Sequence, residues 1–520
     1  MKRAFKLFGI VLGVLLLLPI FSEDVRADGK FKVGMEVNYS PFNWSQPSPD
    51  NGASPVTNSS GEYANGYDVW MAEKLAKKMG KELEIVKIDW DGLPPALVSG
   101  KIDAIIAGMS PTEERKKTID FTDSYYTSDL VMVVKKDGKY SGAKSLEDFS
   151  GAKITGQLNT FHYEVIDQIP GVDKQTALDN FPTMITALST GKIDGYVSER
   201  PGAMAAVAAN PDLAYVVFEE GRGFEASEED TSIAVGVRKG DPIKDEINAA
   251  MAEIGEEERQ DAMQRMVLLT ANDEEGQAGF MQDVEKIWSD YGPMFLRGTL
   301  ITLFISAFAT ICGLIIGLIV QLIRTIPSGK IFESPKDFFL NIIKAILKIY
   351  VEVFRGTPMM VQAMIIYYGS KMFFNIDMNA IFAALLIVSI NTGAYLSETI
   401  RGGVDSVDKG QIEAAKAIGL SHAQTMFKIV MPQALIAIFP SIGNELVVNV
   451  KDTSVLNVIS VTELFFVTKG VAGSTLKTFQ AYFIAACIYL FLTLVLGFIL
   501  RKLSAKINPE KPFNLTSGTN

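Results

Sequence analysis

Two hydrophobic patterns divide the chain. From about residue 28 to 288, short apolar segments alternate with charged ones, whereas from about 295 to 503 the chain consists of long apolar blocks. The first pattern predicts alternating strands and helices, which form a mostly parallel sheet covered by helices. The second pattern predicts membrane-spanning helices, because about 20 apolar residues cross a bilayer. The sequence therefore predicts an α/β domain followed by an all-α transmembrane domain.

The α/β half contains two similar series of elements. The strand "KFKVGMEV", the amphipathic helix "GYDVWMAEKLAKKMG" and the apolar strand "IDAIIAG" form the first series. A second series includes "AKITGQLN" and "KIDGYVS", and "SIAVGVRKGDP" then returns as a strand of the first type. We expect two lobes within 28–272, the first comprising about 28–130 and 225–272 and the second about 131–224, with a ligand cleft between them. The Ser-, Asn- and Pro-rich stretch 45–66 is predicted to be a solvated loop near the cleft mouth.

The second half contains apolar blocks at about 295–323, 339–370, 378–397, 431–450 and 478–500. Lys344, Lys348, Glu352 and Arg355 interrupt the second block, which we interpret as an interfacial helix leading into a shorter span. About five spans are expected within 292–505, after a linker at 273–291. Five spans with an external start place the tail 506–520 in the cytoplasm. Basic residues then also lie on the cytoplasmic side, which agrees with the positive-inside bias: Arg324, Lys330, Lys336, Arg501, Lys502, Lys506 and Lys511.

The N-terminus has the features of a secretory signal peptide over residues 1–27. Lys2, Arg3 and Lys6 precede an apolar stretch, and small residues stand near Ala27 at the cleavage position. An uncleaved membrane anchor is the alternative. In either case the residues that follow are expected to lie outside the cell.

Composition narrows the possible chemistry. The net charge of −11 lies mainly in the first half, which argues against nucleic acid as a partner. The two cysteines, Cys312 and Cys487, lie far apart in apolar blocks, and only two histidines are present, His162 and His422. A disulfide framework, a zinc site and a catalytic triad are therefore not expected, and we predict no metal and no cofactor.

One segment, "AGMSPTEERKK", has distinct chemistry. After the strand "IDAIIAG" the chain turns at Gly108 and presents Ser110, Thr112 and Arg115. Arginine binds carboxylates through two parallel hydrogen bonds. A glycine carbonyl nearby can accept from an ammonium group, and a serine hydroxyl can donate to a carboxylate. The segment thus fits recognition of an amino acid, although an arginine at a strand end commonly forms only a surface ion pair.

Residues 30–272 resemble the polar amino-acid family of extracytoplasmic solute-binding proteins. The resemblance rests on "YSPF" from Tyr39, "NGYDVWMAEKLA", "WDGLPPALVSGKIDAIIAGMSPTEERKKTIDFTDSYY" and "GKIDGYVSERP". It implies the two-lobed, type II periplasmic-binding-protein fold. It implies that Arg115, Ser110 and Thr160 hold the ligand carboxylate and that the Gly108 carbonyl faces the ligand amino group. Glu199, where the family usually has Asp, would contact the amine, and the rings of Tyr39 and Trp90 would flank the ligand side chain.

Glu36 stands where relatives carry an acidic residue facing the ligand side chain. An acidic pocket end disfavours glutamate and aspartate and leaves arginine, lysine, histidine or glutamine, with basic side chains slightly favoured. Tyr39 and Trp90 would hold the aliphatic part of the ligand between aromatic faces. The alternative is that Glu36 pairs with a basic residue of the protein and never contacts ligand.

The stretch "EAAKAIGLSHAQTMFKIVMP" is too polar for the lipid core and too regular for an unstructured loop. We predict two short helices with a bend, in the cytoplasm between two spans. It resembles the coupling signature of type I permease subunits of ATP-binding-cassette (ABC) importers, as do "RGTP" and "NELVVNVKDTS" within about 292–505. The matching positions are Glu413, Ala414, Ala415, Gly419, Ile429 and Pro432.

This resemblance implies docking onto an ATPase. No G-x-x-x-x-G-K-[S/T] loop occurs in the 520 residues, so we expect the ATPase to be a separate chain. Importers of this type need two permease halves. A homodimer with two ATPase copies, embedded in membrane lipid, is therefore expected.

The sequence thus predicts the binding and membrane subunit of an ATP-driven importer for a polar amino acid, with no catalytic activity of its own. A ligand-gated ion channel of the glutamate-receptor type is the first alternative, but its pore would be inserted between the lobes. An enzyme on the two-lobed scaffold is the second, and no nucleophile–base pair or metal cluster supports it.

Overall fold

The computed structural model describes residues 29–227, 231–271, 279–329 and 334–507. The predicted signal peptide, Lys330, Lys511 and nearly all of the predicted tail lie outside the described residues. The described chain divides into two compact units. One comprises 29–298 together with Leu464–Ala486, and the other comprises Thr299–Glu463 and 487–507.

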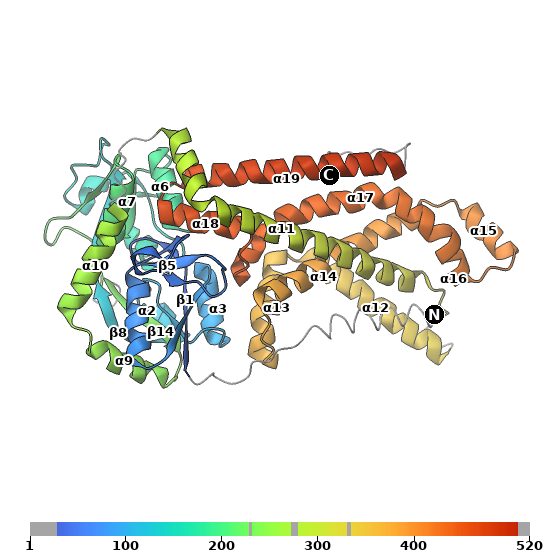
Figure 1. Cartoon of the computed structure of the whole chain (residues 1–520), viewed down its shortest axis with the longest axis horizontal. Coiled ribbons are helices and arrows are strands. Elements are labelled where there is room, and N and C mark those ends of the chain that lie inside the picture. Colours follow the sequence, from blue (N-terminus) through green and yellow to red (C-terminus); the bar gives the residue numbers. More distant parts are fainter. Residues whose placement is uncertain (1–28, 228–230, 272–278, 330–333, 508–520) are drawn as a thin grey trace. The chain divides into compact units, whose positions relative to one another are not determined.

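The first lobe of the α/β unit is a five-stranded sheet in the order β6-β1-β7-β14-β8 (Figure 1). β1 is parallel to β6 and β7, whereas β14 is antiparallel to β7 and β8. Phe31, Val33 and Met35 alternate along β1 and are fully buried, as the strand period of two requires. The elements of this lobe are β1 (Lys30–Met35), β6 (Glu82–Lys87), β7 (Ala104–Ile105), β8 (Ile119–Thr127), β14 (Ser232–Arg238), α2 (Tyr67–Lys78), α3 (Leu93–Val98), α4 (Glu113–Lys116), α9 (Ile243–Ala252) and α10 (Glu256–Ala271).

The second lobe is a separate five-stranded sheet in the order β11-β10-β12-β9-β13. The chain enters it between β8 and β9 and returns between β13 and β14, so two connections join the lobes. The predicted two-lobed fold is confirmed. The elements of this lobe are β9 (Leu130–Lys135), β10 (Lys153–Thr155), β11 (Asp173–Lys174), β12 (Gly195–Glu199), β13 (Leu213–Val216), α5 (Phe161–Glu164), α6 (Phe181–Ser189) and α7 (Arg200–Ala209).

The stretch 45–66, predicted as a solvated loop, is instead partly built into a small antiparallel sheet. That sheet has the order β2-β3-β5-β4, with β2 (Asn38–Tyr39), β3 (Asn43–Gln46), β4 (Ser54–Pro55) and β5 (Tyr63–Asn65). Glu62 is buried there and forms an ion pair of 2.5 Å with Lys87. Ser45 and Ser59 also donate hydrogen bonds to this carboxylate. The prediction failed because composition does not show that a polar stretch finds buried partners elsewhere in the chain.

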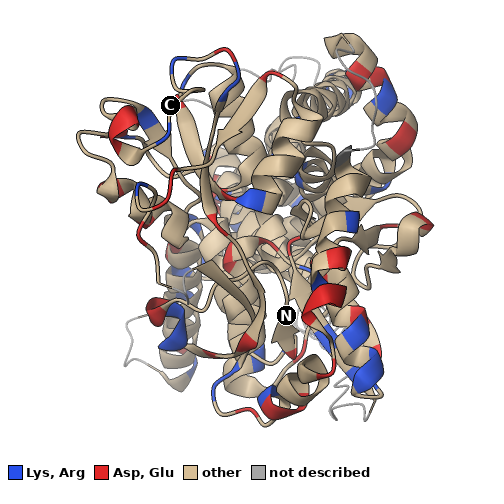
Figure 2. Ribbon diagram, turned by 90° about the vertical axis from the view of Figure 1, so that its left-hand side faces the viewer, with Lys and Arg blue, Asp and Glu red and all other residues tan. Residues whose placement is uncertain are grey.

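Charged residues of both signs are interspersed over the helices of the α/β unit (Figure 2). Lys74, Lys78 and Lys81, on and just after α2, pair with Glu258, Glu253 and Glu246 of α10 and the α9 region. These pairs are exposed, and exposed ion pairs contribute little to stability in water. The mixed surface is typical of a solvated domain.

Helices make up most of the remaining described residues. Within the described part of the chain, four helical stretches are long and apolar enough to cross a membrane: Phe280–Thr325, Ala380–Asp405, His422–Ile459 and Thr478–Ile507. The helices are α11 (Phe280–Thr325), α12 (Pro335–Gly356), α13 (Met359–Phe374), α14 (Ala380–Asp405), α15 (Lys409–Ala417), α16 (His422–Thr425), α17 (Met431–Asp452), α18 (Leu464–Thr475) and α19 (Thr478–Ile507). The second half of the predicted linker belongs to the start of α11.

The apolar block predicted at 339–370 is not one continuous helix. It breaks between α12 and α13 at Thr357 and Pro358, because proline disfavours helical backbone in the residue before it. The broken helix agrees with the interpretation of this block as a charged helix leading into a shorter one.

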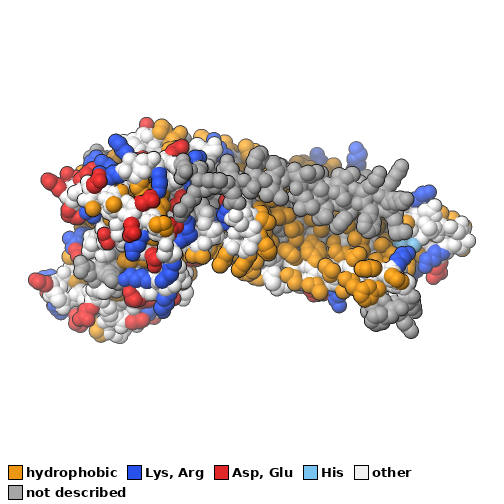
Figure 3. Space-filling model, turned by 90° about the horizontal axis from the view of Figure 1, so that it is seen from below, with side chains coloured by type: hydrophobic (Ala, Val, Ile, Leu, Met, Phe, Trp, Pro, Cys, Tyr) orange, Lys and Arg blue, Asp and Glu red, His pale blue; other side chains and the backbone are white. Residues whose placement is uncertain are grey.

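Large hydrophobic side chains are exposed along the long helices and gather over much of the face shown in Figure 3. Exposed large side chains occur on several of the helices: Leu300, Phe304, Ile311, Phe339, Ile346, Ile349, Phe491, Leu494 and Phe498. Such a contiguous apolar surface is typical of helices that contact lipid.

The boundary between the units differs from the sequence-based domain boundary at 292. The segment Leu464–Ala486, which comprises α18 and the beginning of α19, belongs to the same compact unit as the two lobes. The apolar pattern of this segment does not distinguish it from the other helices of 292–505.

Candidate functional site

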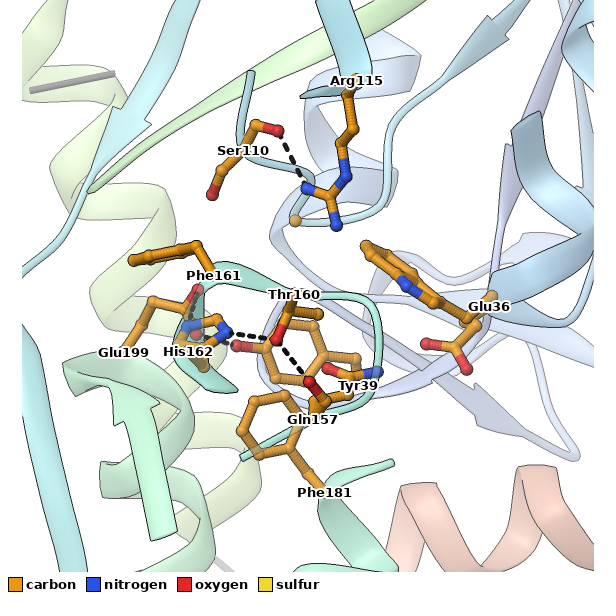
Figure 4. Close-up of a pocket in the computed structure, with 12 residues that line it drawn as sticks. Glu36, Tyr39, Ser110, Arg115, Gln157, Thr160, Phe161, His162, Phe181 and Glu199 are labelled. Atoms are coloured by element: carbon orange, nitrogen blue, oxygen red, sulfur yellow. Dashed lines mark hydrogen bonds and ion pairs between the residues drawn. The ribbon is translucent and has the colours of Figure 1, made fainter. Parts of the chain in front are cut away.

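All residues predicted to contact ligand line one pocket between the two lobes (Figure 4). Its empty volume is about 310 Å³, including open space at its mouth. The predicted lining residues are Glu36, Tyr39, Trp90, Gly108, Ser110, Arg115, Thr160 and Glu199. Four further residues line it that the sequence analysis did not assign to the site: Gln157, Phe161, His162 and Phe181. Three of these flank Thr160 in sequence, which is the signal that could have identified them.

Arg115 extends from α4, whose first turn is capped by the Thr112 side chain. Its guanidinium donates to the Ser110 carbonyl and to the Asn159 carbonyl, both at 2.9 Å. Burial lowers the pKa of this guanidinium to about 10, which leaves it charged at neutral pH. Because Asn159 belongs to the second lobe, Arg115 links the two lobes at the pocket. Its remaining N–H groups can still donate to an anion.

The Trp90 ring packs against Arg115. The guanidinium carbon lies 5.2 Å from the centre of the indole ring, a cation–π geometry. Tyr39 stacks on Phe181 at 4.6 Å between ring centres and on Phe42 at 5.0 Å. In this structure, therefore, the two rings predicted to clamp a ligand side chain each contact residues of the protein.

The second lobe contributes a series of polar contacts. The Thr160 hydroxyl donates to the Gln157 carbonyl at 2.7 Å, and its oxygen lies 3.2 Å from Nδ1 of His162. Nε2 of His162 lies 2.7 Å from Oε1 of Glu199. Tyr39 of the first lobe donates its hydroxyl proton to Oε2 of the same carboxylate.

Glu199 is therefore fully engaged within the protein. Burial alone would raise the pKa of its carboxyl, but His162 and the Tyr39 hydroxyl outweigh burial and hold that pKa below its ordinary value. The carboxylate is thus ionised and can accept from an ammonium group. A ligand amine has to share this carboxylate with Tyr39 and His162.

Glu36 lines the pocket and is 6% exposed. Asn38 donates to its Oε1 at 3.3 Å. Burial, followed by the nearby negative charge of Asp89, raises the pKa of Glu36 to about 8. The side chain is therefore mostly protonated at neutral pH, so like-charge repulsion of an acidic ligand is weaker than the sequence predicts.

The predicted coupling segment consists of two short helices, α15 and α16, with a bend. Gly419 forms the bend with a φ of +82°, a conformation that residues with a Cβ rarely adopt, and a Cβ there would meet no atom within 4 Å. Glu413 and Ala414 are exposed, and Ile418 is 77% exposed although it is apolar.

The opposite side of the coupling segment is anchored. Ala415 is buried, and Met426, Val430 and Met431 belong to a hydrophobic cluster with residues of α14 and α17. Pro432 is the second residue of α17, which continues directly from a π-helical turn at Met426–Val430. The bent segment thus has a fixed inner side and an exposed outer side.

Among the described residues, no group of three or more His, Cys, Asp or Glu side chains could hold a metal ion. The chemistry offered by the pocket is that of ionic and hydrogen-bonded recognition. Its groups of opposite charge, Arg115 and Glu199, match the two charged groups of a free amino acid.

A two-lobed α/β module with such a pocket, joined to helices suited to a membrane, defines a solute-capturing membrane protein. Residues 31–268 match the bacterial extracellular solute-binding proteins, family 3, and residues 338–509 match the binding-protein-dependent transport system inner membrane component.

The chain is also similar to individual transport proteins. It is 35% identical over 226 residues to the glutamine transport system permease protein GlnP of Escherichia coli (strain K12) and equally to that of Shigella flexneri, covering 43% of this chain and 97% of each relative. An arginine-bound amino acid ABC transporter substrate-binding protein from Streptococcus pneumoniae is 27% identical and covers 46% of this chain and 95% of its own, with a TM-score of 0.41.

The chain therefore belongs to the family of binding-protein-dependent amino-acid ABC importers, with a family 3 solute-binding module and an inner membrane component in one polypeptide. It is a multi-pass membrane protein that provides the solute-binding and inner membrane components of such an importer.

Proposed function

We propose that this chain captures a polar amino acid with a basic or amide side chain outside the cell and passes it through a homodimeric permease driven by a separate ATPase. The observation that carries the proposal is the placement of Arg115 and Glu199 on opposite lobes around one pocket. A free amino acid carries a carboxylate and an ammonium group, and one ligand can satisfy both side chains only when the lobes are closed.

The pocket groups suggest how the ligand lies. The ligand carboxylate pairs with Arg115 and accepts from the Ser110 and Thr160 hydroxyls. The ammonium group faces the Gly108 carbonyl and Glu199. The side chain then extends toward Glu36, between the walls that Tyr39 and Trp90 provide. In a closed pocket with little water, the carboxylate–guanidinium pair is stronger than it is in solution.

The chemistry of Glu36 favours basic and amide side chains. A protonated Glu36 can donate to an amide oxygen, and an ionised Glu36 attracts a cation. The relatives matched by the membrane part are named for glutamine transport, which agrees with the amide alternative.

The transmembrane part supports energy coupling to a partner. The exposed outer side of the coupling segment, with Glu413, Ala414 and Gly419, is suited to dock into an ATPase subunit on the cytoplasmic face. Two copies of this chain and two ATPase subunits complete the importer, with both binding modules on the extracellular face.

Calorimetric titration of the purified full-length chain in lipid nanodiscs with each common amino acid tests the proposal. Arginine, lysine, histidine or glutamine should bind, with affinity that depends on both the free carboxylate and the free amine, so agmatine and amino-acid amides should bind weakly. Tight binding of glutamate alone would overturn the proposed specificity. Failure to bind any amino acid would overturn the proposed function.

A further inference from the structure

A segment of the transmembrane half packs directly on the binding module. Residues 464–478, here called the α18 segment, fall within the range matched by the inner membrane component, yet they belong to the same compact unit as the lobes. The Ser45 backbone N–H donates to the Ser474 hydroxyl at 2.9 Å. At Gly473 the contact is so close that a Cβ would lie 2.3 Å from the Asn38 carbonyl oxygen.

The α18 segment contacts both lobes. On the first lobe, Lys469 forms an ion pair with Asp89. On the second lobe, the Thr478 hydroxyl donates to the Pro182 carbonyl at 2.8 Å. Leu476 is buried and lines a small cavity together with Tyr39 and Phe181, one from each lobe. The segment therefore fits the two lobes in the closed arrangement seen in this structure.

Lys469 brings a positive charge to the outer side of the pocket wall. Its partner Asp89 directly precedes Trp90, which lines the pocket. Asn38, against which Gly473 packs, donates to Glu36. The α18 segment thus contacts Asp89, which precedes Trp90, and Asn38, which bonds to Glu36.

The charges around Glu36 are Asp89, Asp91 and Lys469. Burial and Asp89 together raise the pKa of Glu36, whereas Lys469 lowers it. The positive charge of Lys469 therefore acts on a side chain that lines the pocket. The nearby Lys87–Glu62 pair is almost completely buried and lies against Gly470, but neither of its charges is among the main influences on the pKa of Glu36. Lys469 is therefore the positive charge of the α18 segment that acts at the side-chain end of the pocket.

We propose that Lys469 is a specificity-determining residue that weakens the binding of a cationic ligand side chain, relative to an uncharged amide, while the α18 segment is docked. This inference rests on the proposed function, since it assumes that ligand side chains extend toward Glu36. Like charges repel strongly where water is scarce, whereas an amide carries no net charge for Lys469 to repel. Docking of the segment thereby favours release of a basic amino acid from the closed module.

The test compares arginine and glutamine affinities of the full-length chain in nanodiscs, measured by calorimetry for the parent and for Lys469→Gln. The substitution should tighten arginine binding by about tenfold and leave glutamine binding unchanged. Lys477→Gln is the matched control, because Lys477 lies in the same segment but pairs with Asp283 at 3.5 Å. The control should change neither affinity.

Two further variants separate charge from structure. Lys469→Gln combined with Asp89→Asn removes both charges and should return the arginine-to-glutamine affinity ratio toward that of the parent. Gly473→Ala forces the segment away from Asn38 and should reproduce the selective gain for arginine while Lys469 is retained. An unchanged ratio in Lys469→Gln, or equal shifts for both ligands, overturns the inference. A parent chain that binds neither ligand overturns the proposed function instead.

Discussion

The ligand pocket and the coupling segment differ in how their polar groups are engaged. In the pocket, Arg115 and Glu199 are buried or half-buried and bonded to other parts of the protein. In the coupling segment, Glu413 and Ile418 are exposed. A small ligand can replace internal hydrogen bonds one by one, so its site can be complete in the chain alone. A protein partner covers a whole surface, so its site stays open until the partner is present.

This contrast predicts that damage to the two regions separates binding from energy coupling. The largest effect is expected at Arg115. Arg115→Ala should cost about 3 to 5 kcal/mol of ligand binding, because a ligand carboxylate would be buried without a partner. Calorimetry on the full-length chain measures this loss, and Arg222→Ala, which changes an exposed arginine paired with Glu219, is the control. Retained affinity in Arg115→Ala would refute the assignment of this residue as the carboxylate anchor.

The second effect concerns coupling. Gly419→Trp should leave ligand affinity intact but abolish ligand-stimulated ATP hydrolysis in vesicles that contain the partner ATPase. A bulky residue projects from the exposed bend into the surface where the ATPase would dock. Gly80→Trp is a suitable control, since Gly80 also has a positive φ of +66° and open space around it, but lies in the binding module. Stimulated hydrolysis that survives in Gly419→Trp would contradict the coupling role.

The third effect sharpens the description of the pocket. With a pKa of about 8, Glu36 is protonated at neutral pH, and binding of a cation should release that proton. Arginine affinity should therefore rise with pH up to about 8 and level off above it, by at most about tenfold per pH unit, whereas glutamine affinity should stay flat. Titrations in buffers of different ionisation enthalpy measure the proton release. Glu36→Gln should remove the pH dependence, and an unchanged pH profile would show that another group causes it.

The same raised pKa has a consequence for stability. Between pH 4.5 and 8, the unfolded chain releases the Glu36 proton while the folded chain keeps it. The contribution of Glu36 to the free energy of unfolding is thus complete below this window and is lost as pH rises through it. Glu36→Gln should be relatively more stable at high pH, as thermal unfolding of the full-length chain would show.

The smallest effect is expected at Tyr39. Tyr39→Phe removes the hydrogen bond to Glu199 between the lobes but keeps the stacked ring. We expect about 1 kcal/mol less stabilisation of the closed lobes without ligand and only a minor change in ligand affinity, because the ammonium group then shares Glu199 with His162 alone. Fluorescence transfer between dyes placed on the two lobes measures closure. A lobe distribution identical to that of the parent would show that other contacts hold the lobes closed.

The sequence is most informative where the structural feature lies within one short segment. "AGMSPTEERKK" contains the turn, the hydroxyl and the arginine together, and the bend at Gly419 follows from a helix-forming run that ends in glycine. The sequence does not reveal the pairing of Glu62 with Lys87, because these two buried residues are 25 positions apart. It also gives no indication that Phe181 lines the pocket, because a lone phenylalanine in a helix has no signature of its own.

The sequence by itself determined the two-part organisation, the two lobes, eight of the twelve pocket residues and the position of the bend at Gly419. Each of these follows from local periodicity or from a continuous motif. Only the tertiary structure decided that Tyr39 and His162 share the Glu199 carboxylate, that burial keeps Glu36 protonated, and that the α18 segment packs on the binding module. These features depend on distance and on exclusion of water between residues far apart in the chain, and neither quantity is encoded in any single stretch of sequence.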